Sequence, residues 1–290
     1  MFDLHENDMN QTNENESDIV KPITDKQMAV DNQLTLFHSF KDLNFDIYLI
    51  KNLINSNIEL TNSILDKCKL SNPPLYCGQA VDTEVKSIVS KIFSNSNFQT
   101  TKIKKDGNCL YRAISMSIFG TEYYHIQLRL AAIRVIIKYE SYFRDFVNKS
   151  NSYEKFDKYG NSINHFQKLV NQVGTMGIFG DEIVMVALSI VINRPIPYIN
   201  ADCNQPIINT LFDPECIIKH EDEEQNGCQK FCVAYANESQ LAINPILITL
   251  HSVHYTSIVP TNKDFISNVL KEFEFYNLHP NFILSNNCTV

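Results

Sequence analysis

Cys109 follows a Gly-Asn pair and opens a segment with helical apolar spacing. Residues 106–115 read DGNCLYRAIS. Gly107 and Asn108 favour a tight turn, which predicts that Cys109 lies in the first turn of a helix. The unpaired N–H groups and the positive dipole end there favour a thiolate, so we expect its pKa to fall below the ordinary value of about 8.5. A thiolate is the form of cysteine that attacks carbonyl groups.

The same turn is a candidate oxyanion site. Backbone N–H groups around Gly107, Asn108 and Cys109 would point into one concavity, where they can stabilise the negative oxygen of a tetrahedral intermediate. The competing interpretation is a buried core cysteine at a helix start, a common fate for a single cysteine.

A thiolate nucleophile needs an imidazole that exchanges a proton with it and then protonates the leaving amine. His254 is the candidate because it opens the β-like run 255–259, which follows another apolar run at 246–250. The start of a strand can direct a side chain across a cleft toward the N-terminus of a helix. The alternatives are an ordinary turn histidine and a role for His251, which we expect in the turn between the two strands.

Three helices are expected around these residues. The first covers 109–119 and ends at Gly120. Thr121 is expected to cap the second, whose apolar face has helical spacing. That face consists of Ile126, Leu130, Ile133 and Ile137. Gly180 and Asp181 precede the third, which turns Ile183, Val186, Ala187 and Ile190 inward.

Three β-rich runs follow the helices, at 231–236, 246–250 and 255–259. Helices first and strands last predict an α+β fold. We expect a disordered N-terminal tail at 1–30 and a helical extension at 31–95. The catalytic domain is then 96–262, and 263–290 form a helix or tail.

Composition limits the function classes. The net charge is −8 and the pI is about 5.5, which argues against a nucleic-acid-binding surface. Apolar runs are too short for a membrane span or a signal peptide, which predicts an intracellular protein of the cytoplasm or nucleus. The 8 cysteines are therefore expected to be free thiols.

Two other sets of residues have side chains that could bind a metal or act as acids and bases. Cys216, His220, Cys228 and Cys232 offer four zinc ligands, but their spacing does not match common zinc motifs, so no metal is predicted. Asp181 and Glu182 form a carboxylate pair, but acids at a helix N-terminus already have a structural reason.

The three blocks DGNCLYRAIS, FGDEIVMVAL and HYTSIV, at 106–115, 179–188 and 254–259, resemble the signature blocks of the ovarian-tumour (OTU) family. The resemblance implies a papain-like α+β cysteine protease with a small sheet flanked by helices. It also implies cleavage of ubiquitin, or a ubiquitin-like modifier, from conjugates such as polyubiquitin chains, without a cofactor. Cys109 then corresponds to the nucleophile, His254 to the general acid/base and Asp106 to the aspartate of the catalytic loop.

This sequence departs from the family pattern at two positions. The family often has Asn or Asp two residues after the histidine, where this chain has Thr256, a weaker candidate for orienting His254. Phe179 stands where Trp is frequent. Two alternatives remain open: a catalytically weak OTU-like module that binds ubiquitin or acts as a scaffold, and a thiol hydrolase with another substrate.

Overall fold

The computed structural model describes most of the central part of the chain. The described residues are 34–42, 46–59, 62, 74–91, 97–149, 164–194, 196–202, 207–212 and 246–262. The expected N-terminal tail, the 231–236 strand, the zinc candidates and the 263–290 segment lie outside these residues.

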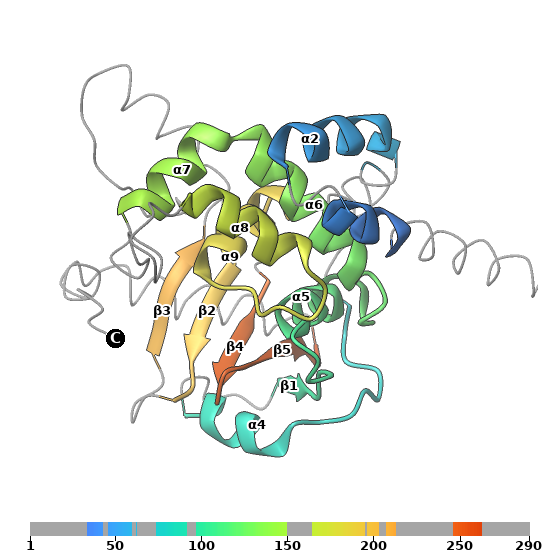
Figure 1. The fold of residues 1–290 in the computed structure, drawn as a ribbon. Helices are drawn as coiled ribbons and strands as arrows, with labels where there is room; N and C mark the ends of the chain where they lie inside the picture. The colour runs from blue at the N-terminus through green and yellow to red at the C-terminus, as the bar shows by residue number, and fades with distance from the viewer. Residues whose placement is uncertain are drawn as a thin grey trace, which may run out of the picture.

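Helices make up much of the described chain (Figure 1). In addition to helical residues at 34–42, they are α2 (Ile47–Ser56), α4 (Thr83–Val89), α5 (Cys109–Phe119), α6 (His125–Lys138), α7 (Glu140–Lys149), α8 (His165–Gly174) and α9 (Glu182–Ile192). Helix α5 begins and ends where the sequence predicted. Gly120, with φ 70°, is its left-handed C-cap, and its N–H donates to Met116 O at 2.9 Å. None of the described helices combines the length and apolar character that crossing a membrane requires.

The start of α6 differs from the prediction. The helix begins at His125 with Tyr124 as its N-cap, so Thr121 does not cap it. The hydroxyl of Ser115 donates to the Thr121 carbonyl at 2.6 Å and accepts from the N–H of Tyr124 at 3.1 Å. These contacts hold the chain between α5 and α6 in a turn, so α6 begins later in the sequence than predicted. The four apolar residues of α6 that were predicted to face the protein core are buried.

In the described part of the chain, five strands form one sheet in the order β1-β5-β4-β2-β3. They are β1 (Phe98–Thr101), β2 (Ile196–Asn200), β3 (Ile207–Phe212), β4 (Ile248–His251) and β5 (His254–Pro260). Only β2 and β4 pair in parallel; the other neighbours are antiparallel. Figure 1 shows α5, α8 and α9 in front of the sheet. The predicted α+β class, with a small sheet flanked by helices, is confirmed.

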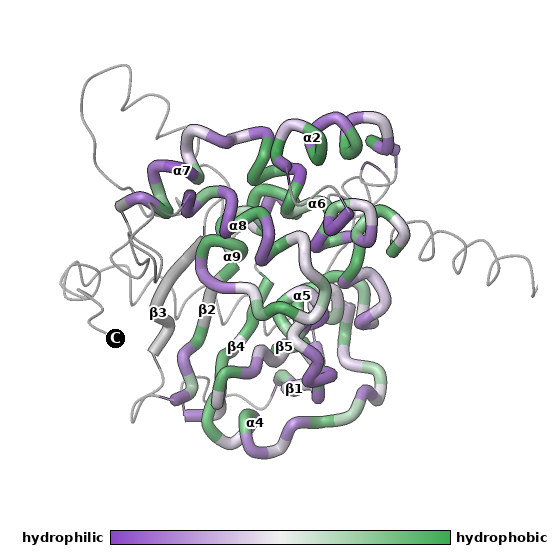
Figure 2. The backbone as a smooth tube through the Cα atoms, in the orientation of Figure 1, coloured by the Kyte–Doolittle hydropathy of each residue, from purple (hydrophilic) through white to green (hydrophobic). Residues whose placement is uncertain are grey.

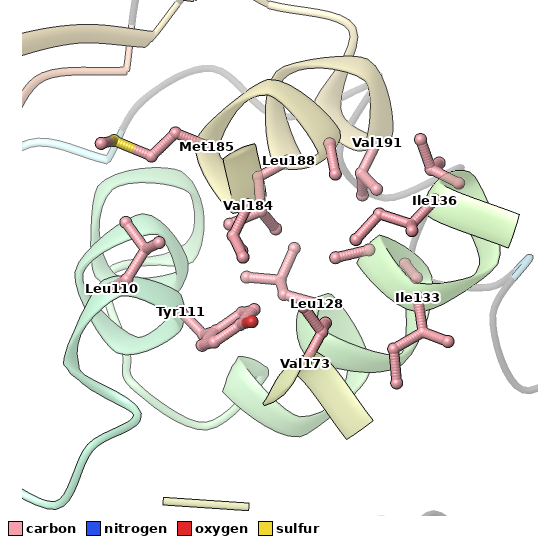
Figure 3. Packing of buried hydrophobic residues seen from close by; sticks show 14 of the residues in the cluster. Leu110, Tyr111, Leu128, Ile133, Ile136, Val173, Val184, Met185, Leu188 and Val191 are labelled. Carbon is pink, nitrogen blue, oxygen red and sulfur yellow. The ribbon is translucent and has the colours of Figure 1, made fainter. Parts of the chain in front are cut away.

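Helices α5, α6, α8 and α9 enclose an apolar core (Figure 3). Tyr111 of α5, Leu128 of α6 and Val184 of α9 point toward one another there, and all are buried. Figure 2 shows the apolar character gathered along α6 and α9, as expected for helices buried on most of their surface. This packing fixes the N-terminus of α5 relative to the sheet.

The predicted helical extension packs on the same core. Leu36, Phe37, Phe40, Ile50 and Ile54 are buried members of the cluster that includes Cys109 and Tyr255. The side chain of Asp46 caps α2 by accepting from Leu49 N at 2.9 Å. The described helices of the extension are therefore continuous with the domain that carries the candidate site.

Candidate active site

Cys109 is the first residue of α5, as predicted, and its free thiol is only 3% exposed. The backbone N–H groups of Tyr255, Leu110 and Cys109 itself favour the thiolate. Burial outweighs these groups and raises the pKa of Cys109, and the negative charge of Asp106 also raises it. The expected low pKa is therefore wrong for this state of the protein. The Tyr255 contact places the sulfur beside the residue that follows His254.

His254 is positioned by a tight hairpin. It opens β5 opposite His251, the last residue of β4. The two residues between them, Ser252 and Val253, have φ of 50° and 59°, as in the turn that joins strands most tightly. The carboxylate of Asp202 accepts the N–H of Ser252 at 2.8 Å and 3.1 Å. Left-handed backbone is rare for a β-branched residue, so the hairpin is strained at Val253, next to His254.

The ring of His254 is held by a backbone group. Its Nε2 lies 3.1 Å from the carbonyl oxygen of Ile103. Because a carbonyl only accepts, Nε2 carries the hydrogen, and in the neutral ring Nδ1 is a base. Burial lowers the pKa of His254, and the charge of Lys105 lowers it further. The imidazole is therefore neutral at pH 7.

Thr256 does not orient His254. Its side chain is fully buried and its Oγ1 has no hydrogen-bond partner. The contact that orients the ring comes instead from the backbone carbonyl of Ile103. No side-chain pattern in the sequence marks such a contact, because it uses only the backbone.

Asp106 shapes the turn before Cys109. Its carboxylate accepts from the N–H of Asn108 at 3.0 Å and from Arg112 at distances down to 2.6 Å. Burial raises the pKa of Asp106, but the hydrogen bonds and charge of Arg112 and the hydrogen bonds from Asn108 bring it to about 2. Arg112 also pairs with Glu122 at 3.3 Å. Asp106 is thus ionised and committed to the turn.

Gly107 is the residue that lets this turn approach the segment before α9. Its φ is 75°, and a Cβ at this position would lie 1.7 Å from the carbonyl oxygen of Gly177. Asn108 supports the same approach, since its Oδ1 accepts the N–H of Gly177 at 3.1 Å. The candidate oxyanion turn of Gly107 and Asn108 is therefore fixed by contacts on both sides.

Sequence reasoning missed Arg129, a residue of α6 that is 1% exposed. Its guanidinium donates to Asn108 Oδ1 at 2.9 Å and to the Ile178 carbonyl at 2.7 Å. A signal was present: Arg129 falls three residues after Ile126 and four before Ile133, on the apolar face of α6. A charged residue on such a face indicates a buried polar network.

The other candidates take different places. Asp181 caps α9, with Oδ1 accepting from Ile183 N at 3.1 Å and Val184 N at 3.2 Å. His251 lies 3.8 Å from Asp202 and 4.0 Å from Glu84. Among the described residues no cluster of His, Cys, Asp and Glu side chains could hold a metal ion.

The comparisons with known proteins agree with the motifs. Residues 100–227 match the family model for the OTU domain of vertnin. Human "OTU domain-containing protein 5" is 23% identical over 167 residues, which is 57% of this chain. These matches support the resemblance of this chain to the OTU-domain family.

The likeness is partial in extent. The match covers 23% of the human protein's length. The solved OTU domain of OTUD1 is similar, with a TM-score of 0.40 and 16% identity over 60% of this chain and 93% of that one. An OTU domain solved in complex with ubiquitin has a TM-score of 0.38 and 16% identity over 60% of this chain and 81% of that one.

Proposed function

We propose that the chain is a cysteine-dependent isopeptidase that removes ubiquitin, or a ubiquitin-like modifier, from conjugates. The observation that carries the proposal is the convergence of two distant segments: the Cys109 sulfur lies beside the backbone N–H of Tyr255, which follows His254. The similarity to OTU-domain proteins supports a deubiquitinase-type activity.

In the proposed reaction Nδ1 of His254 takes the proton of the Cys109 thiol, and the sulfur attacks the isopeptide carbonyl. The carbonyl oxygen becomes an oxyanion at the Gly107–Asn108 turn. His254 returns the proton to the lysine amine as the C–N bond breaks, leaving a thioester on Cys109. Water, deprotonated by His254, then hydrolyses the thioester and regenerates the thiol.

Asp106 and Ile103 have supporting roles in this scheme. Asp106 holds the turn through Asn108 and Arg112, and the Ile103 carbonyl keeps the hydrogen of the neutral imidazole on Nε2 so that Nδ1 is a base. Asp106 makes no contact with His254 in this scheme.

The test is hydrolysis of ubiquitin that carries a fluorogenic amide at its C-terminus, followed by cleavage of polyubiquitin of each linkage. Wild-type protein releases the fluorophore, and Cys109→Ala does not. A Cys109→Ala variant that hydrolyses the substrate at the wild-type rate overturns the assignment of the nucleophile.

A second function, a catalytically weak module that binds ubiquitin, is favoured by one feature of the site. Burial raises the pKa of Cys109 and lowers that of His254, so both groups are uncharged in the free protein. Ubiquitin that binds to folded wild-type protein without being hydrolysed would support this module. An intracellular location remains a prediction under either function.

A further inference from the structure

Arg129 is a buried cation without an anionic partner among the described residues. It is 1% exposed and makes no ion pair with any carboxylate of the described residues. An uncompensated buried charge is strongly destabilising unless hydrogen bonds or an opposite charge offset it. The nearby acid, Asp106, already pairs with Arg112 at 2.6 Å.

The guanidinium connects the Gly107–Asn108 turn to the segment after α8. One nitrogen donates to the carbonyls of Val173 at 3.0 Å and Thr175 at 2.9 Å. The other donates to Asn108 Oδ1 at 2.9 Å and to the Ile178 carbonyl at 2.7 Å, with a longer contact to Gly107 O at 3.4 Å. The Tyr111 ring lies 4.1 Å from the guanidinium carbon.

Neutral side chains can donate to carbonyls, so the hydrogen bonds alone do not require a positive charge. The position of the charge supplies a reason. Asn108, whose Oδ1 accepts a hydrogen bond from Arg129 at 2.9 Å, directly precedes Cys109. Both the thiolate and the tetrahedral oxyanion add negative charge at this place during the reaction.

We propose that Arg129 is a positioning residue for the chemistry at Cys109. Its guanidinium fixes the Gly107–Asn108 turn against residues 172–178, and its buried charge stabilises the thiolate and the oxyanion. The catalytic role rests on the proposed function, whereas the effect on the Cys109 thiol does not.

The first test measures the charge without any ubiquitin substrate. The rate of Cys109 alkylation by iodoacetamide is followed against pH by mass spectrometry of the Cys109 peptide, for wild type, Arg129→Lys and Arg129→Gln. We expect the midpoint to rise by about 1 pH unit in Arg129→Gln, because the neighbouring cation is lost. Arg129→Lys keeps the charge and should retain a midpoint close to that of wild type.

Arg134→Gln is the matched control. Arg134 lies on the same helix, is partly exposed and contacts Asn62 at 2.7 Å, so the same change in charge occurs away from the site. Its midpoint should equal that of wild type. A folded Arg129→Gln with the wild-type midpoint overturns the electrostatic role. If Arg129→Gln does not fold, a folded Arg129→Lys whose midpoint rises by about 1 unit overturns it instead.

The second test measures the positioning role. Asn108→Ala removes the shorter contact between the guanidinium and the turn but leaves Arg129 its carbonyl partners, so the fold should persist. We expect kcat on a fluorogenic ubiquitin amide to fall about 100-fold with little change in KM, as for loss of an oxyanion contact. Unchanged kcat overturns positioning. Wild-type protein that never hydrolyses ubiquitin contradicts the proposed function instead, and the alkylation profiles still decide the role of the charge.

Discussion

The Nε2 atom of His254 lies 3.1 Å from the carbonyl oxygen of Ile103, in the loop that leads from β1 to the Gly107–Asn108 turn. One short loop thus contacts the imidazole through Ile103 and leads to Cys109, the proposed nucleophile. Because the acceptor is a backbone atom, the orientation of His254 does not depend on the hydroxyl of Thr256.

Thr256→Val should leave catalysis unchanged. The hydroxyl of Thr256 is buried without a partner, so a methyl in its place removes an unsatisfied polar group. We expect the free energy of unfolding to rise by about 1 kcal/mol in urea titrations, with wild-type kcat/KM on a fluorogenic ubiquitin amide. Thr249→Val is the control, since Thr249 faces Thr256 across the strand pair and its hydroxyl is also unpartnered. A large loss of activity for Thr256→Val alone would give Thr256 a direct role in orienting His254.

Gly107→Ala should remove activity. The new Cβ would overlap the carbonyl of Gly177 and would require a left-handed backbone, so the turn must move. We expect kcat/KM to fall by about 100-fold or more, as when an oxyanion-binding group is displaced. Gly78→Ala is the matched control: Gly78 has φ 92° but an open surrounding, so it carries the backbone strain alone. Equal activity losses in the two variants would show that the approach to Gly177 is unimportant.

The Asp106 ion pair should stabilise the fold in a pH-dependent way. The folded pKa of about 2 lies below the ordinary value of 3.8, so the carboxylate contributes stability at higher pH and loses it as the pH falls from about 4 toward 2. Asp106→Asn should lower the free energy of unfolding by about 2 kcal/mol at pH 7, and the difference should shrink by pH 3. Chemical denaturation at both pH values measures it. Glu122→Gln removes the longer contact to Arg112 and should cost less. A cost for Asp106→Asn that is the same at both pH values would contradict the ion pair.

Cys109 should react slowly in the free protein at neutral pH. Its thiol is buried and burial raises its pKa, whereas Cys77 is exposed. With iodoacetamide at pH 7, mass spectrometry should find Cys77 modified before Cys109, and raising the pH should accelerate Cys109. Faster labelling of Cys109 at pH 7 would mean that the thiolate already forms in the free protein.

The sequence predicted the elements whose signals are local. Glycine stops α5 at Gly120, and Asp181 caps α9 with its side chain, so both helices were located correctly. The β4–β5 hairpin was found because its apolar runs are short and adjacent. The capping of α6 at Thr121 was wrong, because Ser115, from the preceding helix, holds the intervening turn.

Other parts depend on contacts between distant residues and have weak local signals. Strand β1 has only four residues. Strand β2 pairs in parallel with β4, which comes much later in the chain. At the site, the motif located Cys109, but the Ile103 contact and the raised pKa of the thiol follow only from tertiary packing. Arg129 was missed because the groups that accept its hydrogen bonds, such as the Asn108 side chain and the Ile178 carbonyl, belong to distant segments of the chain.

The proposed attack of Cys109 on the C-terminal carbonyl of ubiquitin can be tested directly. The direct measurement is incubation of the purified full chain with ubiquitin that carries an electrophilic C-terminus, for wild type, Cys109→Ala and His254→Ala. We expect a covalent adduct with wild type, none with Cys109→Ala and slower formation with His254→Ala. An adduct of undiminished yield with Cys109→Ala, or no adduct from folded wild-type protein, would contradict the proposed attack.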